Sequence, residues 1–295
     1  MAGNMSQPRA TVRLDGREIA APLRQHTAAA VAALRQRGVV PSLAVVRVGD
    51  DAASQIYVGA KLKAAAALGI VALEHHLPAA DSQGAVESLV AALAGDDGID
   101  GILVQLPLPR HLDVEGVLAQ VPASKDVDGF GLHSLGALAA GAPGLRPCTP
   151  AGVMRILEHW AAERGEHLAG KRALVIGRSR IVGKPVALLL LAADCTVTIA
   201  HSRSVDLAAL VAEADIVVAA AGSPRLIRGS WLRPGSVVID VGIHRLSDGS
   251  LCGDVDTEGA QGVAGAITPV PGGVGPLTIA QLMANTVAAC EARRA

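Results

Sequence analysis

Short runs rich in valine and isoleucine alternate with alanine- and leucine-rich segments along the whole chain. The first half has such runs at 42–48, 70–77 and 99–106, and segments of helical spacing begin at Pro22, Ala53 and Ser82. The second half repeats the pattern at 172–177, 196–200, 215–222 and 236–242. Because this alternation is typical of a parallel sheet flanked by helices, it predicts an α/β protein.

The two α/β halves are separated by a segment rich in glycine and proline, GALAAGAPGLRPCTPAG. The chain has 295 residues, of which 51% are hydrophobic, and this is enough for two cores. We therefore expect an N-terminal α/β catalytic domain at 1–147 and a Rossmann-like nucleotide-binding domain at 148–275. The final helix, 276–295, is expected to pack back on the first domain.

Composition narrows the classes of partner. The formal net charge of −1 offers no concentrated basic surface for nucleic acid or anionic membrane. Four cysteines show no spacing that would hold a metal, so we expect free thiols in a reducing compartment: Cys148, Cys195, Cys252 and Cys290. No apolar run reaches membrane-spanning length, and the start has no signal-peptide core, although Met5 is an alternative start. A cytoplasmic protein that acts on small molecules is expected.

The stretch SQIYVGAK contains the only tyrosine of the chain, Tyr57, four residues before Lys61. A helix from Ala53 to a stop at Gly69 would place both side chains on one face and Lys63 on another. Spacing alone leaves two alternatives open, an active-site pair or a solvated amphipathic face.

The strand 172–177 runs into RSRIVGKPVALLLL, a turn with glycines that opens a helix. Such a turn can present backbone N–H groups to a pyrophosphate. The spacing is neither GxGxxG nor a P-loop, since five residues separate Gly177 from Gly183 and Pro185 follows the lysine. The turn by itself is therefore compatible with either a nucleotide site or a structural bend.

The end of the next strand reads HSRS, where a dinucleotide fold that prefers NAD has an acidic residue. Ser202 and nearby arginines can instead accept a 2′-phosphate, which indicates NADP. Arg178 is the better cationic partner, while Arg203 is either a ligand or a solvated charge.

Three further stretches place polar or flexible residues where strands end. VQLPLPRH has Gln105 before two prolines, KDVDGFG has Asp126 and Asp128 before a glycine, and TPVPGGVGPLT is a loop at 268–278. Each alone is compatible with a turn, but glycines also permit a close approach of backbone to a ligand.

Eight motifs follow one another across nearly the entire chain: SxxYVxxK, VQLPLP, KDVDG, PCTPxG, GRSxIVGxP, DVG, GDVD and TPVPGGVGP. In this order they resemble the bifunctional methylenetetrahydrofolate dehydrogenase/methenyltetrahydrofolate cyclohydrolases of one-carbon metabolism. The resemblance implies NADP-dependent oxidation of 5,10-methylenetetrahydrofolate to the methenyl form and hydrolysis of that form to 10-formyltetrahydrofolate. It also implies a homodimer of two-domain subunits with the folate in the cleft between the domains.

The resemblance also assigns roles to residues. Lys61 is expected to move protons, Gln105 to orient it, Tyr57 to position the folate rings and Asp128, rather than Asp126, to bind the pterin. Further folate-binding positions fall on Leu106, Pro107, Pro271, Gly272 and Gly273. The cofactor-binding positions fall on Gly177, Arg178, Ser179, Ser202 and Ile243, and no metal is implied. Hydride transfer itself is the chemistry of the nicotinamide.

The chain departs from the family pattern in three places, of which Leu277 in place of methionine is a mild change of a core residue. GDDAAS has Ala52 where proline is usual, and DGFGLHSLGAL has Gly131, Leu132 and Ser134 where His, Pro and Asn are usual. The second segment adjoins the predicted site, so it bears on substrate affinity and on the balance of the two activities.

Two other classes remain as alternatives. Short-chain dehydrogenases also use YxxxK, but there the glycine-rich turn comes first, whereas here Tyr57 precedes Gly177. A non-catalytic or single-activity folate- or nucleotide-binding paralogue is favoured only by the altered DGFGLHSLG segment. An assay of NADPH formation from methylenetetrahydrofolate separates it from the enzyme.

The expected 2′-phosphate contacts give a first testable prediction. A charge-assisted hydrogen bond contributes about 1.5–3 kcal/mol, so Arg178→Ala should reduce the preference for NADP over NAD by on the order of tenfold. The ratio of kcat/KM for the two cofactors measures it. Equal kcat/KM for both cofactors in the unmutated protein would contradict the assignment.

Overall fold

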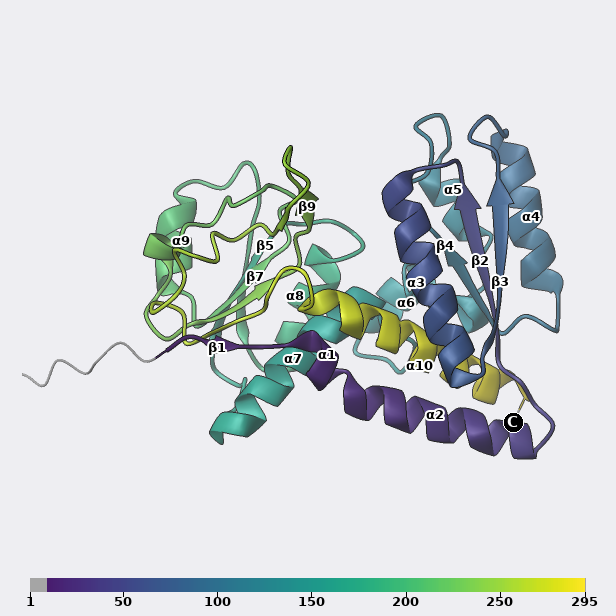
Figure 1. The fold of residues 1–295 in the computed structure, drawn as a ribbon, viewed down its shortest axis with the longest axis horizontal. Coiled ribbons are helices and arrows are strands. Elements are labelled where there is room, and N and C mark those ends of the chain that lie inside the picture. Colours follow the sequence, from purple (N-terminus) through teal and green to yellow (C-terminus); the bar gives the residue numbers. More distant parts are fainter. Residues whose placement is uncertain (1–9, 295) are drawn as a thin grey trace, which may run out of the picture. The chain divides into compact units, whose positions relative to one another are not determined.

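The structure, a computed structural model, describes residues 10–294 (Figure 1), so that Met5 lies outside the described residues. The chain forms two compact α/β units, which confirms the predicted fold class. Unit 1 combines the segment that ends at Ile19 with Thr149–Leu277, and unit 2 combines Ala20–Cys148 with the segment that begins at Thr278.

Unit 2 contains a three-stranded parallel sheet in the order β3-β2-β4. Its strands are β2 (Ser42–Val48), β3 (Val71–Leu77) and β4 (Gly101–Val104). Its helices are α2 (Ala21–Gln36), α3 (Ala52–Leu68), α4 (Gln83–Gly95), α5 (Val114–Ala119) and α6 (Leu132–Ala139), with a 3₁₀ turn, η1 (Ala123–Lys125). Every residue of β2 is buried, because this central strand has a neighbour on both sides and its apolar run faces helices on both surfaces.

Helix α3 begins one residue before its predicted start at Ala53 and ends at the predicted glycine. The Asp51 side chain caps it by accepting from the Ser54 N–H at 2.8 Å, a bond that lowers the pKa of this carboxyl. Ala52 follows in the first turn, so the cap fixes the start without a proline. Gly69 ends the helix in the left-handed region at φ 78°. Tyr57 and Lys61 are therefore one helical turn apart on one face.

Unit 1 contains a six-stranded sheet in the order β1-β11-β8-β7-β5-β6. Its strands are β1 (Val12–Arg13), β5 (Arg172–Ile176), β6 (Thr196–Ala200), β7 (Ile216–Ala219), β8 (Val237–Asp240) and β11 (Ala266–Ile267), and all pairings are parallel. The hairpin β9 (His244–Arg245) and β10 (Leu251–Cys252) lies outside this sheet. Helical segments are α1 (Gly16–Ile19), α7 (Cys148–Arg164), α8 (Gly183–Ala192), α9 (Leu207–Glu213) and η2 (Gly229–Trp231).

The N-terminal segment adds an edge strand to the sheet of unit 1. β1 pairs with β11, and the Leu14 N–H donates to the Ile267 carbonyl at 2.9 Å. The domain limits predicted from the sequence instead place this segment in the N-terminal domain, 1–147. A two-residue strand that pairs across most of the chain has no local pattern from which to predict it.

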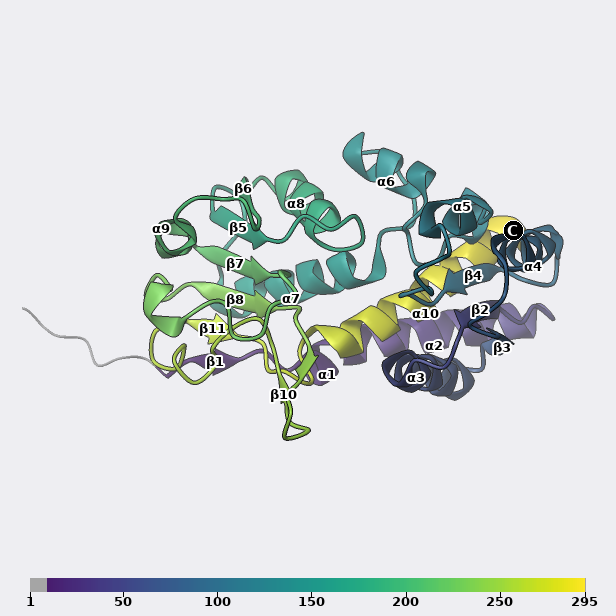
Figure 2. The same cartoon turned by 90° about the horizontal axis from the view of Figure 1, so that it is seen from above.

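Helix α10 (Val274–Arg294) contributes its second part to unit 2. There it lies beside α2 (Figures 1 and 2), and Leu282, Met283 and Val287 join the core that includes residues of α2 and β2. At its end, Arg293 and Arg294 pair with the fully buried carboxylate of Asp100, with the Arg294 Nε 2.9 Å from Oδ1. A buried charge needs such partners because it has lost its water.

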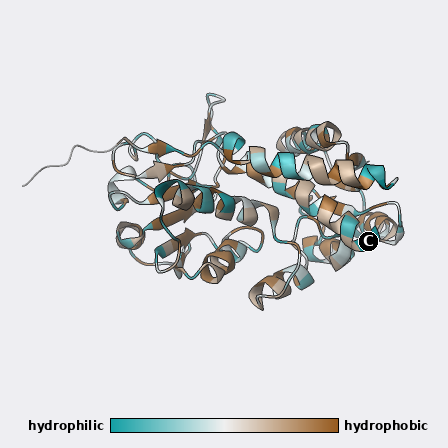
Figure 3. Ribbon diagram, turned by 90° about the horizontal axis from the view of Figure 1, so that it is seen from below, coloured by the Kyte–Doolittle hydropathy of each residue, from teal (hydrophilic) through white to brown (hydrophobic). Residues whose placement is uncertain are grey.

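Within residues 10–294, no helix is both long and apolar enough to cross a membrane. Hydrophilic and hydrophobic residues alternate along the helices in Figure 3. The four cysteines are free thiols and all are buried. Over the same described range, no cluster of three or more His, Cys, Asp or Glu residues could hold a metal ion.

Lys125, the first residue of the KDVDG motif, is buried and closes the end of α4. Its Nζ donates to the carbonyls of Leu93, Ala94 and Asp96 at 3.3, 2.8 and 2.6 Å. Burial lowers the pKa of this ammonium, with a smaller contribution from the charge of Arg293. These bonds satisfy carbonyls that the end of a helix leaves without partners.

This geometry predicts a structural role for Lys125. Lys125→Met removes three charge-assisted bonds but also the cost of burying the ammonium, so the free energy of unfolding should fall by a net of about 2–3 kcal/mol. Chemical denaturation measures the loss. At temperatures where the variant stays folded, kcat should match that of the unmutated protein, and a selective loss of kcat would contradict this role.

Candidate active site

Lys61 and Gln105 meet at the carboxyl end of the small sheet in unit 2. The Gln105 N–H donates to the Val46 carbonyl at 2.8 Å, which holds this residue one step beyond β4. Its side-chain Oε1 accepts from the Lys61 Nζ at 2.9 Å, while Nε2 donates to the Leu106 carbonyl at 2.6 Å. Because both ends of the amide are engaged, it presents an oxygen to the lysine. The two side chains that the sequence predicts to interact are hydrogen-bonded.

Tyr57 lies one helical turn before Lys61 and is 39% exposed. Partial burial raises the pKa of its phenol, because a phenolate would lose part of its hydration. At neutral pH the ring is therefore an uncharged surface beside the lysine. Leu106 and Pro107 follow Gln105, and the peptide bond between them is cis.

Asp128 is partly buried in the loop that follows η1. Burial is the largest influence on this carboxyl and raises its pKa to about 6. The charge of Asp126 adds to the rise in pKa. The charge of Lys61 and a hydrogen bond with Cys148 oppose it. The group therefore titrates close to neutrality, as groups at functional sites often do.

Asp126, two residues earlier, is an anchor for the same loop. Its buried carboxylate accepts from the backbone N–H groups of Gly129, Phe130 and Gly131 at 3.0, 3.2 and 2.8 Å. The hydroxyl of Ser134 donates to it at 2.6 Å. With four donors the carboxylate is fully occupied, which leaves Asp128 as the member of the pair with room for a ligand.

The segment that departs from the family pattern takes part in this anchor. Ser134 supplies one of the four hydrogen bonds, and a Cβ at Gly131 would come within 2.8 Å of the Asp126 Oδ2. Leu132, by contrast, is 75% exposed. Gly131 and Ser134 thus support the Asp126 anchor directly, whereas Leu132 faces solvent.

In unit 1, close backbone packing shapes the turn between β5 and α8. Gly177 has φ 125°, and a Cβ there would collide with the Ala220 carbonyl. A Cβ on Gly183 would lie 2.6 Å from the Gly177 carbonyl carbon. The Ser179 hydroxyl accepts from the Val182 and Gly183 N–H groups at 3.2 and 3.3 Å. Glycine is required at both positions because strand, turn and helix approach so closely.

The predicted cofactor residues lie where neighbouring strands of this sheet end. Arg178 and Ser179 follow β5, Ser202 follows β6 and Ile243 follows β8, and all four are exposed. Parallel strands end at one edge, where open α/β sheets bind nucleotides. His201 and Ser204 hold the loop around Ser202: the His201 N–H donates to the Ser204 hydroxyl at 2.9 Å, and the His201 Nδ1 accepts from the Arg203 N–H at 3.2 Å.

The loop with Pro271, Gly272 and Gly273 also belongs to unit 1. Gly272 has φ 105°, and its carbonyl accepts from the Gly16 N–H at 2.9 Å. A Cβ on Gly273 would lie 2.7 Å from the Pro269 oxygen. Glycine at 273 is thus demanded by packing within the loop, whereas Pro271 is exposed.

Asp254, from the GDVD motif, has no predicted role but organises the loop after β7. Its buried carboxylate accepts from the N–H groups of Ala221, Gly222 and Ser223 at 2.6, 3.0 and 2.9 Å, and the His244 Nε2 lies 2.7 Å away. The GDVD motif singles out Asp254 in the sequence, but only the fold shows which groups its carboxylate binds. Asp240 lies beside it, and burial raises the pKa of Asp240 to about 6.

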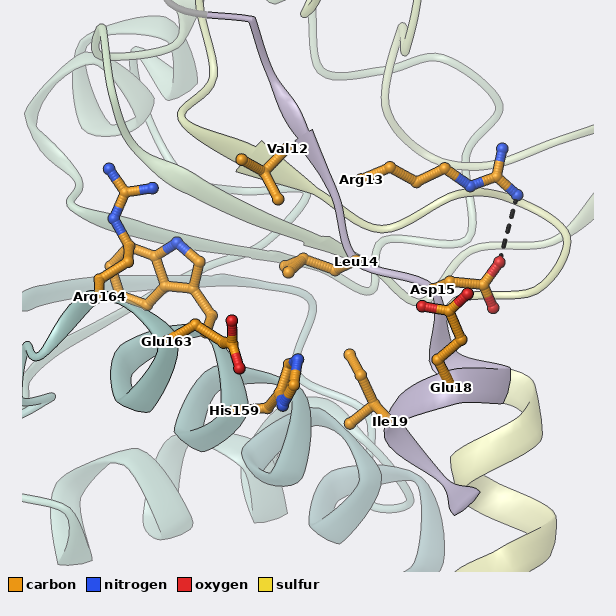
Figure 4. Close-up of a pocket in the computed structure, with 10 residues that line it drawn as sticks. Val12, Arg13, Leu14, Asp15, Glu18, Ile19, His159, Glu163 and Arg164 are labelled. Atoms are coloured by element: carbon orange, nitrogen blue, oxygen red, sulfur yellow. Dashed lines mark ion pairs between the residues drawn. The ribbon is translucent and has the colours of Figure 1, made fainter. Parts of the chain in front are cut away.

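A separate hollow of about 280 Å³ in unit 1 (Figure 4) contains none of the predicted site residues. Residues of β1, α1 and α7 line it, with Leu14 and Ile19 beside charged side chains of both signs. Arg13 and Asp15 at its rim form an ion pair of 3.6 Å. The hollow is distinct from the edge where the strands end.

One unit has the parallel strand edge of a nucleotide-binding fold, and the other holds Lys61, Gln105 and Asp128, an arrangement typical of a two-domain dehydrogenase. The model of the tetrahydrofolate dehydrogenase/cyclohydrolase catalytic domain matches residues 14–128, and that of the family's NAD(P)-binding domain matches residues 147–294. The chain belongs to the tetrahydrofolate dehydrogenase/cyclohydrolase family.

Individual relatives agree with this membership. The bifunctional protein FolD of Anaeromyxobacter dehalogenans is 53% identical over 275 residues, which cover 93% of this chain and 96% of that protein. The crystal structure of the bifunctional FolD from Campylobacter jejuni is 42% identical with a TM-score of 0.92, covering 96% of this chain and 100% of that one. The Trypanosoma brucei FolD, solved with NADP and an inhibitor, is 39% identical with a TM-score of 0.91, covering 96% and 98%.

The raised pKa of Asp128 predicts a stability effect with a definite sign. The folded-state pKa of about 6 lies above the ordinary value of 3.8, so the folded protein holds this proton to a higher pH than the unfolded chain does. The stability that this proton contributes is fully present below pH 3.8 and is lost as pH rises through 6. Asp128→Asn cannot ionise, so it should melt at a higher temperature than the unmutated protein at pH 8, with the difference shrinking toward pH 4. Thermal denaturation at both pH values checks this, and a lower melting temperature for the variant at pH 8 would contradict it.

Proposed function

We propose that the Lys61, Gln105 and Asp128 site serves both reactions of the family. The protein oxidises 5,10-methylenetetrahydrofolate with NADP and hydrolyses the methenyl product to 10-formyltetrahydrofolate. The observation that carries the proposal is the 2.9 Å hydrogen bond from the Lys61 Nζ to the Gln105 Oε1, with a near-neutral carboxyl at Asp128 in the electrostatic field of the lysine. A paralogue that had lost catalysis would have no need to keep this set.

For the oxidation, unit 1 supplies a cofactor site and unit 2 positions the donor. The close backbone packing at Gly177 and the exposed Arg178 and Ser202 fit a dinucleotide with a 2′-phosphate. NADP supplies the hydride chemistry when it is bound. The methylene carbon loses hydride and no proton, so the side chains of this step need only align the substrate.

For the hydrolysis, Lys61 handles protons. Water adds to the cationic methenyl carbon, the bond from this carbon to N5 breaks, one proton of the water moves to N5 and the other is released. The Lys61 Nζ donates to the Gln105 Oε1, which holds the Nζ at the strand edge. An amine in that position can receive the proton from water, and the ammonium so formed can return it to nitrogen.

Asp128 is assigned to the pterin. An ionised carboxylate accepts from adjacent N–H donors, such as the amino group and ring N–H of a pterin. Asp126 cannot take this role because its oxygens already have four donors. Tyr57, Leu106, Pro107 and the loop at 271–273 are proposed as the remaining folate contacts.

The proposed function also implies binding partners and a cellular location. Partners are tetrahydrofolate one-carbon derivatives and a second copy of the chain, the homodimer being implied by the family. The net charge of −1 gives no electrostatic basis for nucleic-acid binding. Four buried free thiols support a cytoplasmic location. The domain limits 1–147, 148–275 and 276–295 stay a proposal.

The proposed role of Lys61 predicts that its substitution reduces the cyclohydrolase activity more than the dehydrogenase activity. Lys61→Met keeps most of the side-chain volume but removes the amine, so cyclohydrolase activity should fall by roughly 10²–10⁴. Dehydrogenase activity should fall less, and methenyltetrahydrofolate should accumulate, as followed by its absorbance. Lys63→Met, on an exposed face of the same helix, is the matched control and should leave both activities nearly intact. Undiminished hydrolysis by the Lys61 variant would refute the assignment.

A further inference from the structure

Asn285 of α10 is a buried amide to which neither the sequence motifs nor the proposed mechanism gives a role. It is 4% exposed, and its Nδ2 donates to the carbonyls of Val127 and Arg146 at 2.8 and 2.9 Å. Gln281, one turn earlier on the same helix, donates to its Oδ1 at 2.8 Å. Because both carbonyls only accept, the amide nitrogen has to face them, and every hydrogen-bonding group of Asn285 is used.

The two carbonyls lie at special places in the chain. The Val127 carbonyl belongs to the peptide plane that leads into Asp128, and Arg146 lies two residues before Cys148. Asn285 thus ties the Asp128 loop to the segment that begins α7. Because the peptide plane before Asp128 is fixed, rotation of that plane can no longer redirect the Asp128 side chain.

Cys148 fixes the other side of Asp128. Its N–H donates to the Asp128 carbonyl at 3.4 Å, and its thiol, which also faces the Asp128 carboxylate, lies 3.3 Å from the Val127 carbonyl oxygen. The Asn285 Nδ2 also contacts this sulfur at 3.6 Å. The peptide planes before and after Asp128 are therefore both held, one by Asn285 and Cys148 together and the other by Cys148.

We propose that Asn285, oriented by Gln281, is a positioning residue that sets the direction of the Asp128 carboxylate and thereby the affinity for the folate substrate. The inference rests on the proposed role of Asp128. It assigns to α10 a function beyond its apolar packing, since this helix carries the amide that the loop needs. A buried amide that satisfies two backbone carbonyls is costly to replace, because each would lose its donor away from water.

The test is steady-state kinetics of Asn285→Ala with both substrates varied. A misplaced Asp128 weakens folate binding in the ground state and the transition state alike, so the KM for methylenetetrahydrofolate should rise about tenfold while the KM for NADP stays unchanged. The KM for methenyltetrahydrofolate in the hydrolysis assay should rise with it. A purely structural role would reduce the amount of folded enzyme, and so kcat, without moving either KM.

Thr286→Val is the matched control. Thr286 is the next residue of the same helix, is fully buried, and donates to the carbonyl of Leu282 in its own helix at 2.8 Å. Its replacement removes a buried hydrogen bond of similar length that does not reach the Asp128 loop. Neither KM should change. An equal rise in folate KM for both variants would overturn the inference.

Asp128→Asn in the same assays distinguishes failure of the positioning role of Asn285 from failure of the proposed role of Asp128. If Asp128→Asn raises the folate KM and Asn285→Ala does not, the positioning role is wrong and the proposed function stands. If Asp128→Asn leaves the folate KM unchanged, the role of Asp128 and the inference fail together. Should Asn285→Ala not fold, Asn285→Ser keeps a donor for one carbonyl, and the same comparison of folate and NADP KM decides.

Discussion

The loop that carries Asp128 depends on one buried carboxylate, that of Asp126. Three backbone N–H groups and one hydroxyl converge on it, so the dipoles of these donors hold the carboxylate inside unit 2. The bonds to Gly129 and Gly131 curl the chain immediately after Asp128. Without this anchor, the N–H groups of the loop would lose the acceptor that defines its path.

The two carboxylates of the KDVDG motif show how environment assigns roles to identical groups. Asp126 is saturated with donors, whereas burial dominates at Asp128 and raises its pKa to about 6. The charge of Lys61 moderates that rise. Different hydrogen-bond surroundings thus give Asp126 a structural role and leave Asp128 with room for a ligand. For the same reason Asp126 is not a neutral comparison for substitutions at Asp128.

The cofactor edge of unit 1 is built from close backbone contacts. Gly177 against Ala220 and Gly183 against Gly177 leave no space for a Cβ. Asp254 then holds the three N–H groups of the loop after β7. The polar side chains that face solvent there, including Arg178 and Ser202, are therefore carried on backbone that is itself fixed, which suits recognition of a phosphate.

Local patterns in the sequence determined the α/β class, the strand β2 at 42–48, and the cap and stop of α3 that place Tyr57 beside Lys61. Motif order indicated the family, and the resemblance to that family predicted the Lys61–Gln105 contact. Tertiary structure alone decided that β1 pairs with β11, that Asp126 is the anchor, and that Asn285 reaches the Asp128 loop. The reason is physical: periodicity and capping depend on residues within a turn or two, whereas these pairings join distant segments whose partners become neighbours only when the core has formed.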